Sequence, residues 1–406
     1  MRRVTLTAVP AVLTLVLLLC AFCLPLVRES AAPAAEAAPV KGTLTTVGQG
    51  DHALKVLVLE GSPYEMGYAQ GVLLKDEVKG LIADALPTLL GTERVVLDQI
   101  DQTYRQQAPY IPEAYKEEMR GLSDGSGVPL EMVQRAQVLP ETAEFACSAC
   151  AAWGKATRDG HFYQVRNLDW EVRAHVQDYA VIVVYKPDHG VPFVNVTWAG
   201  FLGVFTGINA EKIAIGSIGD YYGREHERYD GITVAFLARR VLQECRTLDE
   251  AVAMIRDARR TSAYVYCVGD GKTPDARGFH TAADIFECFG PGQFPPPYVP
   301  MPQAVYMYMG RGGIGRLHDR LKAHYGDIAP DNLMSDVIPA TGMESANLHE
   351  VISDNTALKL WIANAGPDGS PAFSQPYVEF DAAPYLSPSH QGPGATQNGV
   401  PPGQRA

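Results

Sequence analysis

The pattern of apolar and polar residues changes once along this chain, close to Cys147. Before that point the pattern mostly favours helices. The segment LKVLVLEG, residues 54–61, predicts a strand, and a helix is expected to follow it from Ser62. Ser62 is a favoured N-cap residue, Pro63 suits the first helical position, and Glu65 completes a capping box with Ser62.

Two glycines in this predicted helix, Gly67 and Gly71, are four residues apart and therefore share one face. Because a glycine inside a helix costs about 1 kcal/mol, the pair indicates close packing against another element. Two more helices are expected within residues 111–139, separated by the Gly-Ser-Gly turn at residues 125–127.

After Cys147 the sequence is rich in strand-like runs. Residues 149–157 and 161–168 flank Arg158-Asp159-Gly160, and an Asp-Gly pair between such runs is a strong hairpin signal. A helical front followed by strands, helices and strands again is typical of a layered α+β architecture. The remaining elements are expected as helices at 231–245 and 247–259, and as strands at 178–186, 192–200, 212–220, 263–270, 303–309, 348–353 and 358–364.

The N-terminal region has the features of a targeting segment. Arg2 and Arg3 precede an apolar run from Val4 to Val27, and small residues follow, with a cleavage site expected within Ala31 to Ala38. We therefore expect the protein to be exported, either secreted or periplasmic. The run approaches the roughly 20 residues that span a bilayer, so an uncleaved membrane anchor is the alternative.

Composition and charge narrow the range of partners. The 406 residues are 47% hydrophobic and 20% charged, as in ordinary globular proteins. The net charge is −12 and there is no long basic run, which argues against a nucleic-acid partner. The last residues, 387–406, are rich in Pro, Gly and Gln and are expected to be disordered.

The stretch Cys147-Ser148-Ala149-Cys150 allows several chemical roles. A zinc site needs two more ligands at similar spacing, and the sequence has no second Cys-x-x-Cys. A redox pair should open a helix, whereas this stretch opens a predicted hairpin. A local disulfide, two buried structural cysteines and a nucleophile stay open. Cys245 and Cys267 lie in apolar contexts and are expected to be core thiols.

The predicted hairpin brings polar groups to these cysteines. Its second strand returns beside the first, so Arg166 and Asp169 should come close to them. A guanidinium near a thiol favours the thiolate, and a carboxylate can orient an amine. A simple register about Asp159-Gly160 places Cys150 opposite Asp169, whereas a bulge would bring Cys147 there.

The stretch CSACAAWGKATRDGHFYQVRNLDW resembles the nucleophile hairpin of N-terminal-nucleophile cysteine hydrolases. It is most similar to the acyl-coenzyme A:6-aminopenicillanate acyltransferase-like family, with bile-salt hydrolases and acid ceramidases as more distant relatives. EGSPYEMGYAQG, GLSDGSGV, GINAEKIAIGSI and NLHEVISDNTALKLWIANA extend the resemblance over most of residues 55–385. It implies an α+β fold, a four-layer αββα sandwich with a helical N-terminal segment.

The resemblance also implies self-processing. The cysteine would cut the Ala146–Cys147 bond, and the new α-amine would act as general base, its ordinary pKa being about 7.7–8.0. The chain would then divide into four parts: residues 1–40, a signal peptide or anchor with a linker; 41–146, a helical pro-segment or small subunit; 147–386, the catalytic region; and 387–406, the tail.

Site residues carry over by position. Cys147 corresponds to the nucleophile, with Cys150 as the alternative, and Arg166 and Asp169 correspond to the residues that flank the new amine and the substrate carbonyl. Asn209 corresponds to an asparagine that helps to hold the oxyanion, a donor whose loss can cost about 3–4 kcal/mol. His349, close to Asn347, matches a family pattern whose role the residues do not reveal.

The resemblance thus implies a cysteine amidohydrolase or acyltransferase that acts on linear amide C–N bonds through an acyl-enzyme on Cys147. It implies no cofactor, a small-molecule acyl amide or acyl thioester as substrate, and the self-derived small subunit as partner. The alternatives are a phospholipase-B-like ester hydrolase on the same scaffold and a catalytically silent, membrane-anchored binding protein. Trp153, Trp170, Tyr221 and Tyr222 are candidates for lining an acyl pocket.

Overall fold

The computed structural model describes residues 40–87, 94–141, 146–170, 172–220, 223–293, 299–308, 313–342 and 346–387. The expected signal or anchor and nearly all of the expected tail lie outside these ranges. Within them, no helix combines the length and the apolar character that crossing a bilayer requires.

Nine strands form a large sheet in the order β1-β2-β5-β6-β7-β8-β9-β10-β11. Neighbouring strands are antiparallel except for β2 and β5, which run parallel. The strands are Gly42–Val47 (β1), Leu54–Gly61 (β2), Ala180–Pro187 (β5), Phe193–Trp198 (β6), Thr206–Asn209 (β7), Ile213–Gly219 (β8), Tyr264–Asp270 (β9), Asp275–Thr281 (β10) and Phe286–Phe289 (β11).

A smaller, six-stranded sheet is entirely antiparallel and has the order β12-β3-β4-β13-β14-β15. The two strands of the predicted nucleophile hairpin, β3 and β4, lie inside this sheet. Its strands are Ala146–Ala152 (β3), Tyr163–Asp169 (β4), Ala304–Tyr308 (β12), Asn347–Asp354 (β13), Lys359–Asn364 (β14) and Val378–Asp381 (β15).

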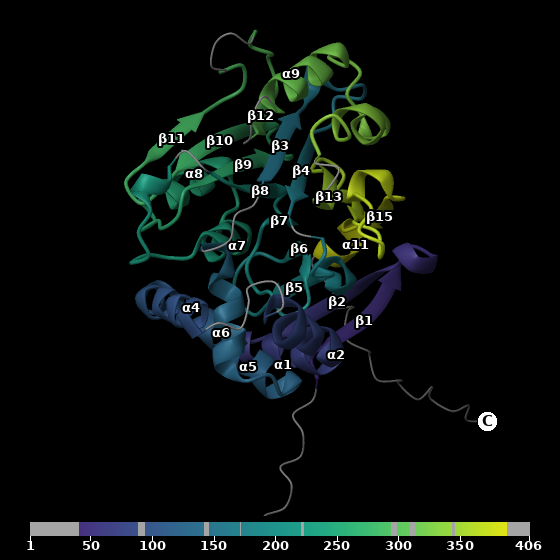
Figure 1. Cartoon of the computed structure of the whole chain (residues 1–406). Helices are drawn as coiled ribbons and strands as arrows, with labels where there is room; N and C mark the ends of the chain where they lie inside the picture. The colour runs from purple at the N-terminus through teal and green to yellow at the C-terminus, as the bar shows by residue number, and fades with distance from the viewer. Residues whose placement is uncertain are drawn as a thin grey trace, which may run out of the picture. The chain divides into compact units, whose positions relative to one another are not determined.

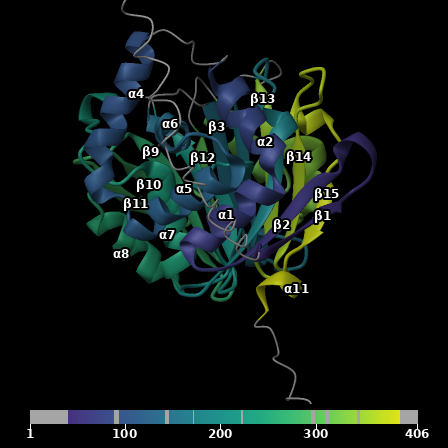
Figure 2. The same cartoon turned by 90° about the horizontal axis from the view of Figure 1, so that it is seen from below.

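The two sheets face each other, and helices cover their outer sides (Figures 1 and 2). A Cβ atom added to Gly216 of β8 would lie 3.1 Å from Arg166 and 3.7 Å from Ala149, so β8 touches β3 and β4 across the interface. The four-layer α+β prediction is confirmed. The helices are Pro63–Leu73 (α1), Lys75–Lys79 (α2), Arg94–Gln107 (α4), Glu113–Ser126 (α5), Leu130–Val138 (α6), Val234–Glu244 (α7), Leu248–Asp257 (α8), Gly313–Ala323 (α9), Pro330–Asn332 (α10) and Ala383–Leu386 (α11).

Local signals in the first helix are also confirmed. The Ser62 side chain accepts a hydrogen bond from the Glu65 N–H, and the Glu65 side chain accepts one from the Ser62 N–H at 2.9 Å. A Cβ atom on Gly67 or Gly71 would lie 2.0 Å or 2.6 Å from backbone carbonyl oxygens of α5. The two glycines therefore let α1 pack against α5 at backbone distance.

The N-terminal segment is built into the rest of the fold. It supplies β1 and β2 as well as helices, and β2 pairs with β5 along seven residue pairs. Glu118 of α5 and Arg239 of α7 form a buried ion pair of 2.5 Å, with each side chain at most 1% exposed. The Arg239 guanidinium also lies 4.4 Å and 4.6 Å from the ring centres of Tyr115 and Tyr185. These non-covalent contacts hold residues 41–141 against the rest of the fold and do not depend on the peptide bond that links the two parts.

The connection between β3 and β4 differs from the simple prediction. Residues 153–162 join the two strands, so the turn is a long loop and not a tight hairpin. Cys150 pairs with Val165, and Asp169 pairs with Ala146. The predicted pairing of Cys150 with Asp169 is therefore wrong, because the longer loop shifts the register toward the N-terminal end of β3.

Candidate active site

Cys147 is the second residue of β3 and is fully buried. Side chains alternate along a strand, so Cys147 shares a face with Ala149, which contacts Gly216 of the large sheet. Cys150 lies on the opposite face and belongs to the apolar cluster around α9. Both thiols are free, because their side chains point to opposite sides of the sheet.

Arg166 of β4 points toward Cys147. Its Nη2 atom lies 3.7 Å from the Cys147 Sγ atom. Nε and Nη2 both donate to the Ser217 carbonyl oxygen at 3.2 Å, and the guanidinium lies 5.6 Å from the centre of the Phe205 ring. Nη1 has no hydrogen-bond partner among the described residues. The Arg166 guanidinium is therefore held in place beside the thiol, and its Nη1 atom can donate a hydrogen bond to an oxygen.

The surroundings of Cys147 act on its pKa in opposite directions. Burial raises the pKa of the thiol, and the Asp169 carboxylate raises it further. The Arg166 guanidinium lowers it, as do the backbone N–H groups of Gly219 and Asp169. The net direction is upward, so the thiol of the uncut chain is protonated at neutral pH. A base must take this proton before Cys147 can attack a carbonyl.

Asp169 lies next to the Ala146–Cys147 peptide bond. It is the last residue of β4, it pairs with Ala146, and its side chain is buried. Its Oδ1 atom accepts a hydrogen bond of 3.0 Å from the Asn347 amide. The Ala146–Cys147 bond thus lies between a cation on one face of the sheet and a carboxylate at the strand end.

An apolar cavity of about 440 Å³ adjoins this region. Its wall includes Leu168, the strand partner of Cys147, and Phe205, which lies under Arg166. Of the tryptophans expected in an acyl pocket, Trp170 lines the cavity, whereas Trp153 stacks on a core phenylalanine. The other lining residues are Leu81, Leu86, Ala136, Leu139, Pro140, Val176, Trp198 and Phe201. Tyr221 and Tyr222 lie outside the described residues.

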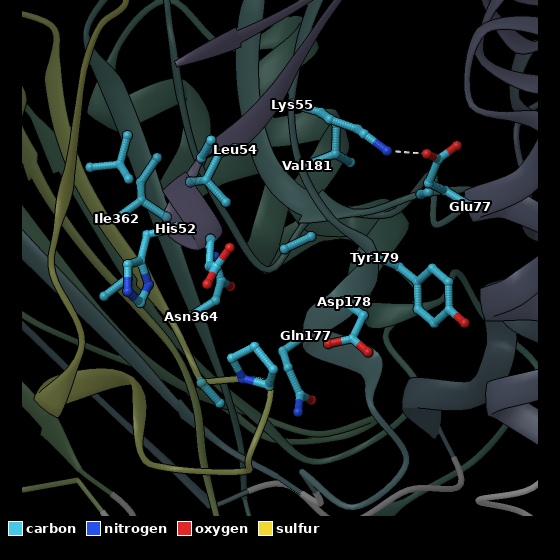
Figure 3. Close-up of a pocket in the computed structure, with 18 of the residues that line it drawn as sticks. His52, Leu54, Lys55, Glu77, Gln177, Asp178, Tyr179, Val181, Ile362 and Asn364 are labelled. Atoms are coloured by element: carbon cyan, nitrogen blue, oxygen red, sulfur yellow. Dashed lines mark hydrogen bonds and ion pairs between the residues drawn. The ribbon is translucent and has the colours of Figure 1, made fainter. Parts of the chain in front are cut away.

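A second and more polar cavity, of about 770 Å³, lies at one end of β2, β5 and β14 (Figure 3). An ion pair between Lys55 and Glu77 and the side chain of Gln177 border it. Neither Cys147 nor Arg166 lines this cavity. Cys147 and Arg166 do not line the apolar cavity either, but Leu168, which pairs with Cys147, and Phe205, which lies under Arg166, do. The apolar cavity is therefore the one next to the neighbours of the thiol.

A sequence model of one family agrees with this geometry. The model of acyl-coenzyme A:6-aminopenicillanic acid acyl-transferase matches residues 156–276, a range that contains Arg166 and Asp169. This part of the chain is therefore similar to the acyl-transferase family. The family is one of N-terminal-nucleophile amidases related to acid ceramidase.

Individual relatives extend the match along the chain. Protein dcd1B of Dictyostelium discoideum is 26% identical over 86% of this chain and 78% of its own length. Acid ceramidase of Rattus norvegicus is 20% identical over 47% of this chain and 54% of its own length. The structure of a Caenorhabditis elegans N-acylethanolamine-hydrolyzing acid amidase ortholog covers 58% of this chain and 99% of that one, with 14% identity and a TM-score of 0.42.

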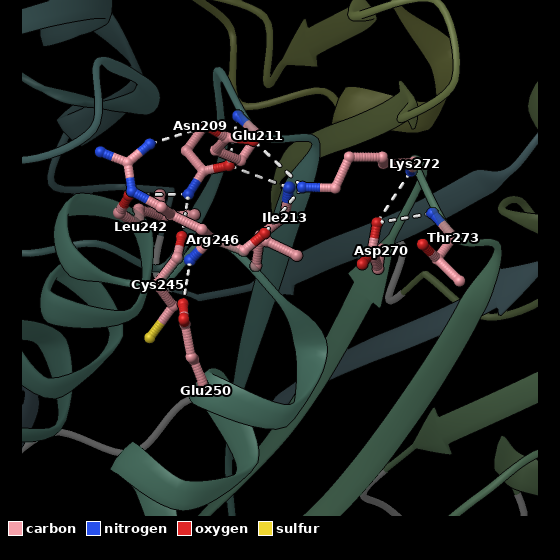
Figure 4. Close-up of polar contacts among 10 residues, drawn as sticks. All are labelled: Asn209, Glu211, Ile213, Leu242, Cys245, Arg246, Glu250, Asp270, Lys272 and Thr273. Carbon is pink, nitrogen blue, oxygen red and sulfur yellow. Dashed lines mark hydrogen bonds and ion pairs between the residues drawn. The ribbon is translucent and has the colours of Figure 1, made fainter.

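Asn209 does not have the place that the acyl-transferase resemblance implied. Its Nδ2 atom donates to the Leu242 and Cys245 carbonyl oxygens, at 2.9 Å and 2.8 Å (Figure 4). Its Oδ1 atom accepts from the N–H groups of Glu211 and Ile213, at 3.0 Å and 2.9 Å. The side chain is thus fully engaged in holding a turn to the end of α7.

Distance excludes the oxyanion role as well. Asn209 lies at the Ile213 end of β8, whereas Cys147 lies beside Gly219 at the other end. Six residues of strand separate these ends by about 20 Å. The prediction that Asn209 holds the oxyanion therefore disagrees with the structure, and the backbone N–H groups of Gly219 and Asp169 lie closer to Cys147.

His349 of β13 is a buried neutral residue. Its Nδ1 atom lies 3.0 Å from Asn364 Oδ1, and its ring lies 5.5 Å from that of Trp198. Burial, followed by the Arg166 guanidinium, lowers the pKa of His349 to about 3. It cannot serve as a cation at neutral pH, and it packs next to the apolar cavity.

Cys150 has none of the activating neighbours of Cys147. Burial, and then the Glu350 carboxyl group, raises the pKa of its thiol to about 12. Of the two cysteines, Cys147 is therefore the one with a cation beside its thiol.

Other residues in this region carry little signal in the sequence. Asn347 and Glu350 lie on β13, where the Asn347 amide nitrogen donates both to Asp169 and to Glu350, and Tyr264 of β9 pairs with Gly219, whose backbone N–H lies beside Cys147. The run NLHE, which was noted only for its histidine, contains the first two of these. Tyr264 stands in an ordinary strand pattern, and no local signal marked it.

Proposed function

We propose that this protein is an exported, self-processing cysteine amidase or acyltransferase that acts on linear amides with an apolar acyl group. The observation that carries the proposal is the placement of Arg166 Nη2 at 3.7 Å from Cys147 Sγ, directly after the Ala146–Cys147 bond. The match of residues 156–276 to the acyl-transferase family model and the apolar cavity support the same chemistry. The apolar run after Arg2 and Arg3 supports export.

The first step is the cut. The Cys147 sulfur attacks the Ala146 carbonyl carbon, the C–N bond breaks, and the nitrogen gains the proton that the thiol lost, becoming the free α-amine of Cys147. Water then hydrolyses the thioester, leaving a carboxylate on Ala146 and returning the thiol. Because Asp169 is paired with Ala146, its carboxylate lies where it can hold the new ammonium group.

The second step is turnover. The α-amine takes the thiol proton, and the thiolate attacks the substrate carbonyl. The Arg166 guanidinium stabilises the thiolate, and its Nη1 atom can donate to a substrate oxygen. The leaving amine departs with the proton, and water or a second amine takes the acyl group from Cys147.

The cavity suggests the acyl group. Its wall consists of apolar and aromatic side chains, which suit an apolar acyl group. Five of its lining residues, Leu81, Leu86, Ala136, Leu139 and Pro140, belong to the segment before the cut. The N-terminal piece is therefore expected to stay bound and to form half of the acyl site.

The test is the mass of the purified protein. A chain expressed without residues 1–39 should yield two fragments that meet at Ala146–Cys147 and elute together from a sizing column. Cys147→Ala should stay in one piece, whereas Cys150→Ala, the matched control, should process normally. A wild-type chain that stays intact and inactive would overturn the proposal and favour a silent binding protein.

Substrate preference is the second measurement. Paired amides and esters with acyl chains of graded length should show turnover of the amides, with a preference for apolar acyl groups that fill the cavity. Turnover of the esters alone would favour the phospholipase-B-like alternative.

A further inference from the structure

The side-chain amide of Asn347 has an unusual number of hydrogen-bond acceptors. Its nitrogen lies 2.6 Å from Asn167 Oδ1, 2.7 Å from Glu350 Oε1 and 3.0 Å from Asp169 Oδ1. The orientation of the amide is fixed, because its oxygen accepts a hydrogen bond of 2.8 Å from the Phe373 N–H. One NH₂ group thus faces three oxygens.

The number of hydrogens is too small for three acceptors. An amide NH₂ carries two, so one oxygen lacks a full hydrogen bond from Asn347. Asn167 Oδ1 is an amide oxygen and cannot carry a proton. Two ionised carboxylates on one buried amide would repel each other, so either Asp169 or Glu350 must hold a proton.

The surroundings select Glu350. Its side chain is completely buried, and its Oε2 atom has no hydrogen-bond partner among the described residues. Burial, followed by the charge of Asp169, raises the pKa of Glu350 well above its usual range. The groups that face it are Asp169 and Arg166 on β4, Asn347 on its own strand, Cys150 on β3 and Tyr377 before β15. Of these, Arg166 is the one cation, and its guanidinium is bonded to Ser217 and directed at Cys147.

We propose that Glu350 is a positioning residue that carries a proton and, through Asn347, holds Asp169 ionised at the Cys147 end of β3. This inference rests on the proposed function, since Asp169 there holds the new α-ammonium group. The neutral acid lets Asp169 keep the only negative charge of the cluster. If Glu350 loses its proton at alkaline pH, the cluster gains a second negative charge. Asn347 then no longer holds Asp169 in position.

The experiment compares Glu350→Gln with Glu350→Leu in the full chain without residues 1–39. Glu141→Gln is the matched control, because Glu141 is also buried with a raised pKa but bonds to Ser262 and the Val234 N–H. Self-cleavage and amide turnover are measured across the pH range in which melting curves show a folded protein.

A neutral amide can replace a neutral acid of the same size, so Glu350→Gln should process and turn over within about threefold of wild type at neutral pH. Its activity should extend to higher pH than that of wild type, because the group that titrates is gone. Glu350→Leu, which cannot bond to Asn347, should lose most processing, and Glu141→Gln should keep the wild-type pH profile.

Two results would overturn the inference. One is a Glu350→Gln pH profile that superimposes on that of wild type. The other is a decrease of about 100-fold or more in the processing or turnover rate of a folded Glu350→Gln protein. A decrease of that size is expected when a residue that acts as a general acid or base is removed. Infrared spectroscopy separates this inference from the proposed function. A protonated-carboxyl band should appear in the difference spectrum of wild type minus Glu350→Gln even if the protein proves inactive, and the absence of a band from that difference spectrum would also refute the inference.

Discussion

Replacing Arg166 by methionine tests the electrostatic basis of the candidate site. With 3.7 Å between Nη2 and the Cys147 sulfur and an effective dielectric constant of about 20, the cation stabilises the thiolate by about 4 kcal/mol. This energy corresponds to a change of about 1,000-fold in the ratio of thiolate to thiol. It is an upper limit, because Asp169 acts on Cys147 with the opposite sign. Methionine keeps much of the apolar stem but has no charge.

Self-cleavage is the direct assay. Cell-free synthesis with a short pulse of label gives the rate at which the uncut chain disappears at each pH. The midpoint of this rate should move upward in Arg166→Met, and at neutral pH the rate should fall by up to about 1,000-fold. Arg166→Lys keeps the charge and should shift the midpoint less. Arg240→Met, on an exposed pair of α7, should have no effect.

The reasoning fails if Arg166→Met melts at the wild-type temperature and still cleaves at the wild-type rate with the same pH midpoint. That result would mean that the guanidinium does not set the thiolate population. A loss of cleavage together with a much lower melting temperature would instead trace the effect to the bonds with Ser217, and Arg166→Lys would then be as defective as Arg166→Met.

Three further predictions concern other parts of the fold. Glu118→Gln leaves the Arg239 cation buried without its partner and should lower the free energy of unfolding by about 3–5 kcal/mol in urea titrations. Glu113→Gln, at an exposed position on the same helix, should leave the free energy of unfolding nearly unchanged. Asn209→Ala should cost at least about 2 kcal/mol, because it leaves buried turn groups unpaired, yet the surviving folded protein should still self-cleave, whereas an oxyanion donor would be needed for that reaction. Leu139→Trp should fill part of the apolar cavity and reduce turnover of long-chain amides more than that of short-chain amides, and an equal effect on both would contradict the assigned acyl site.

The sequence predicted those features that depend on neighbours in the chain. The capping box at Ser62 and Glu65 needs only three residues of spacing, and the structure contains it. The glycine pair Gly67 and Gly71 indicated close packing because a glycine in a helix has a cost that something must offset. Neither signal named α5 as the partner, since that contact depends on the tertiary fold.

Features that depend on residues far apart in the sequence could not be predicted from it. The register of β3 against β4 is set by the long loop between them and by β13 on the far side of β4, so a count about Asp159-Gly160 could not give it. The arrangement of Asp169, Asn347 and Glu350 joins strands more than 170 residues apart. Asn209 was misplaced because its motif resembles a family pattern, while its four partners lie at the C-terminal end of α7 and in the turn that leads into β8.

The parallel pairing of β2 with β5 has a consequence for how the mature protein would respond to denaturation. The Ala146–Cys147 bond lies between these strands in the chain, so a cut protein is one sheet made from two molecules. Its melting temperature should then rise with protein concentration, whereas that of the uncut Cys147→Ala chain should not. Refolding would then require two separate fragments to meet, so its rate would fall as the protein is diluted. In a very dilute solution the unfolded fragments would not regain the native structure.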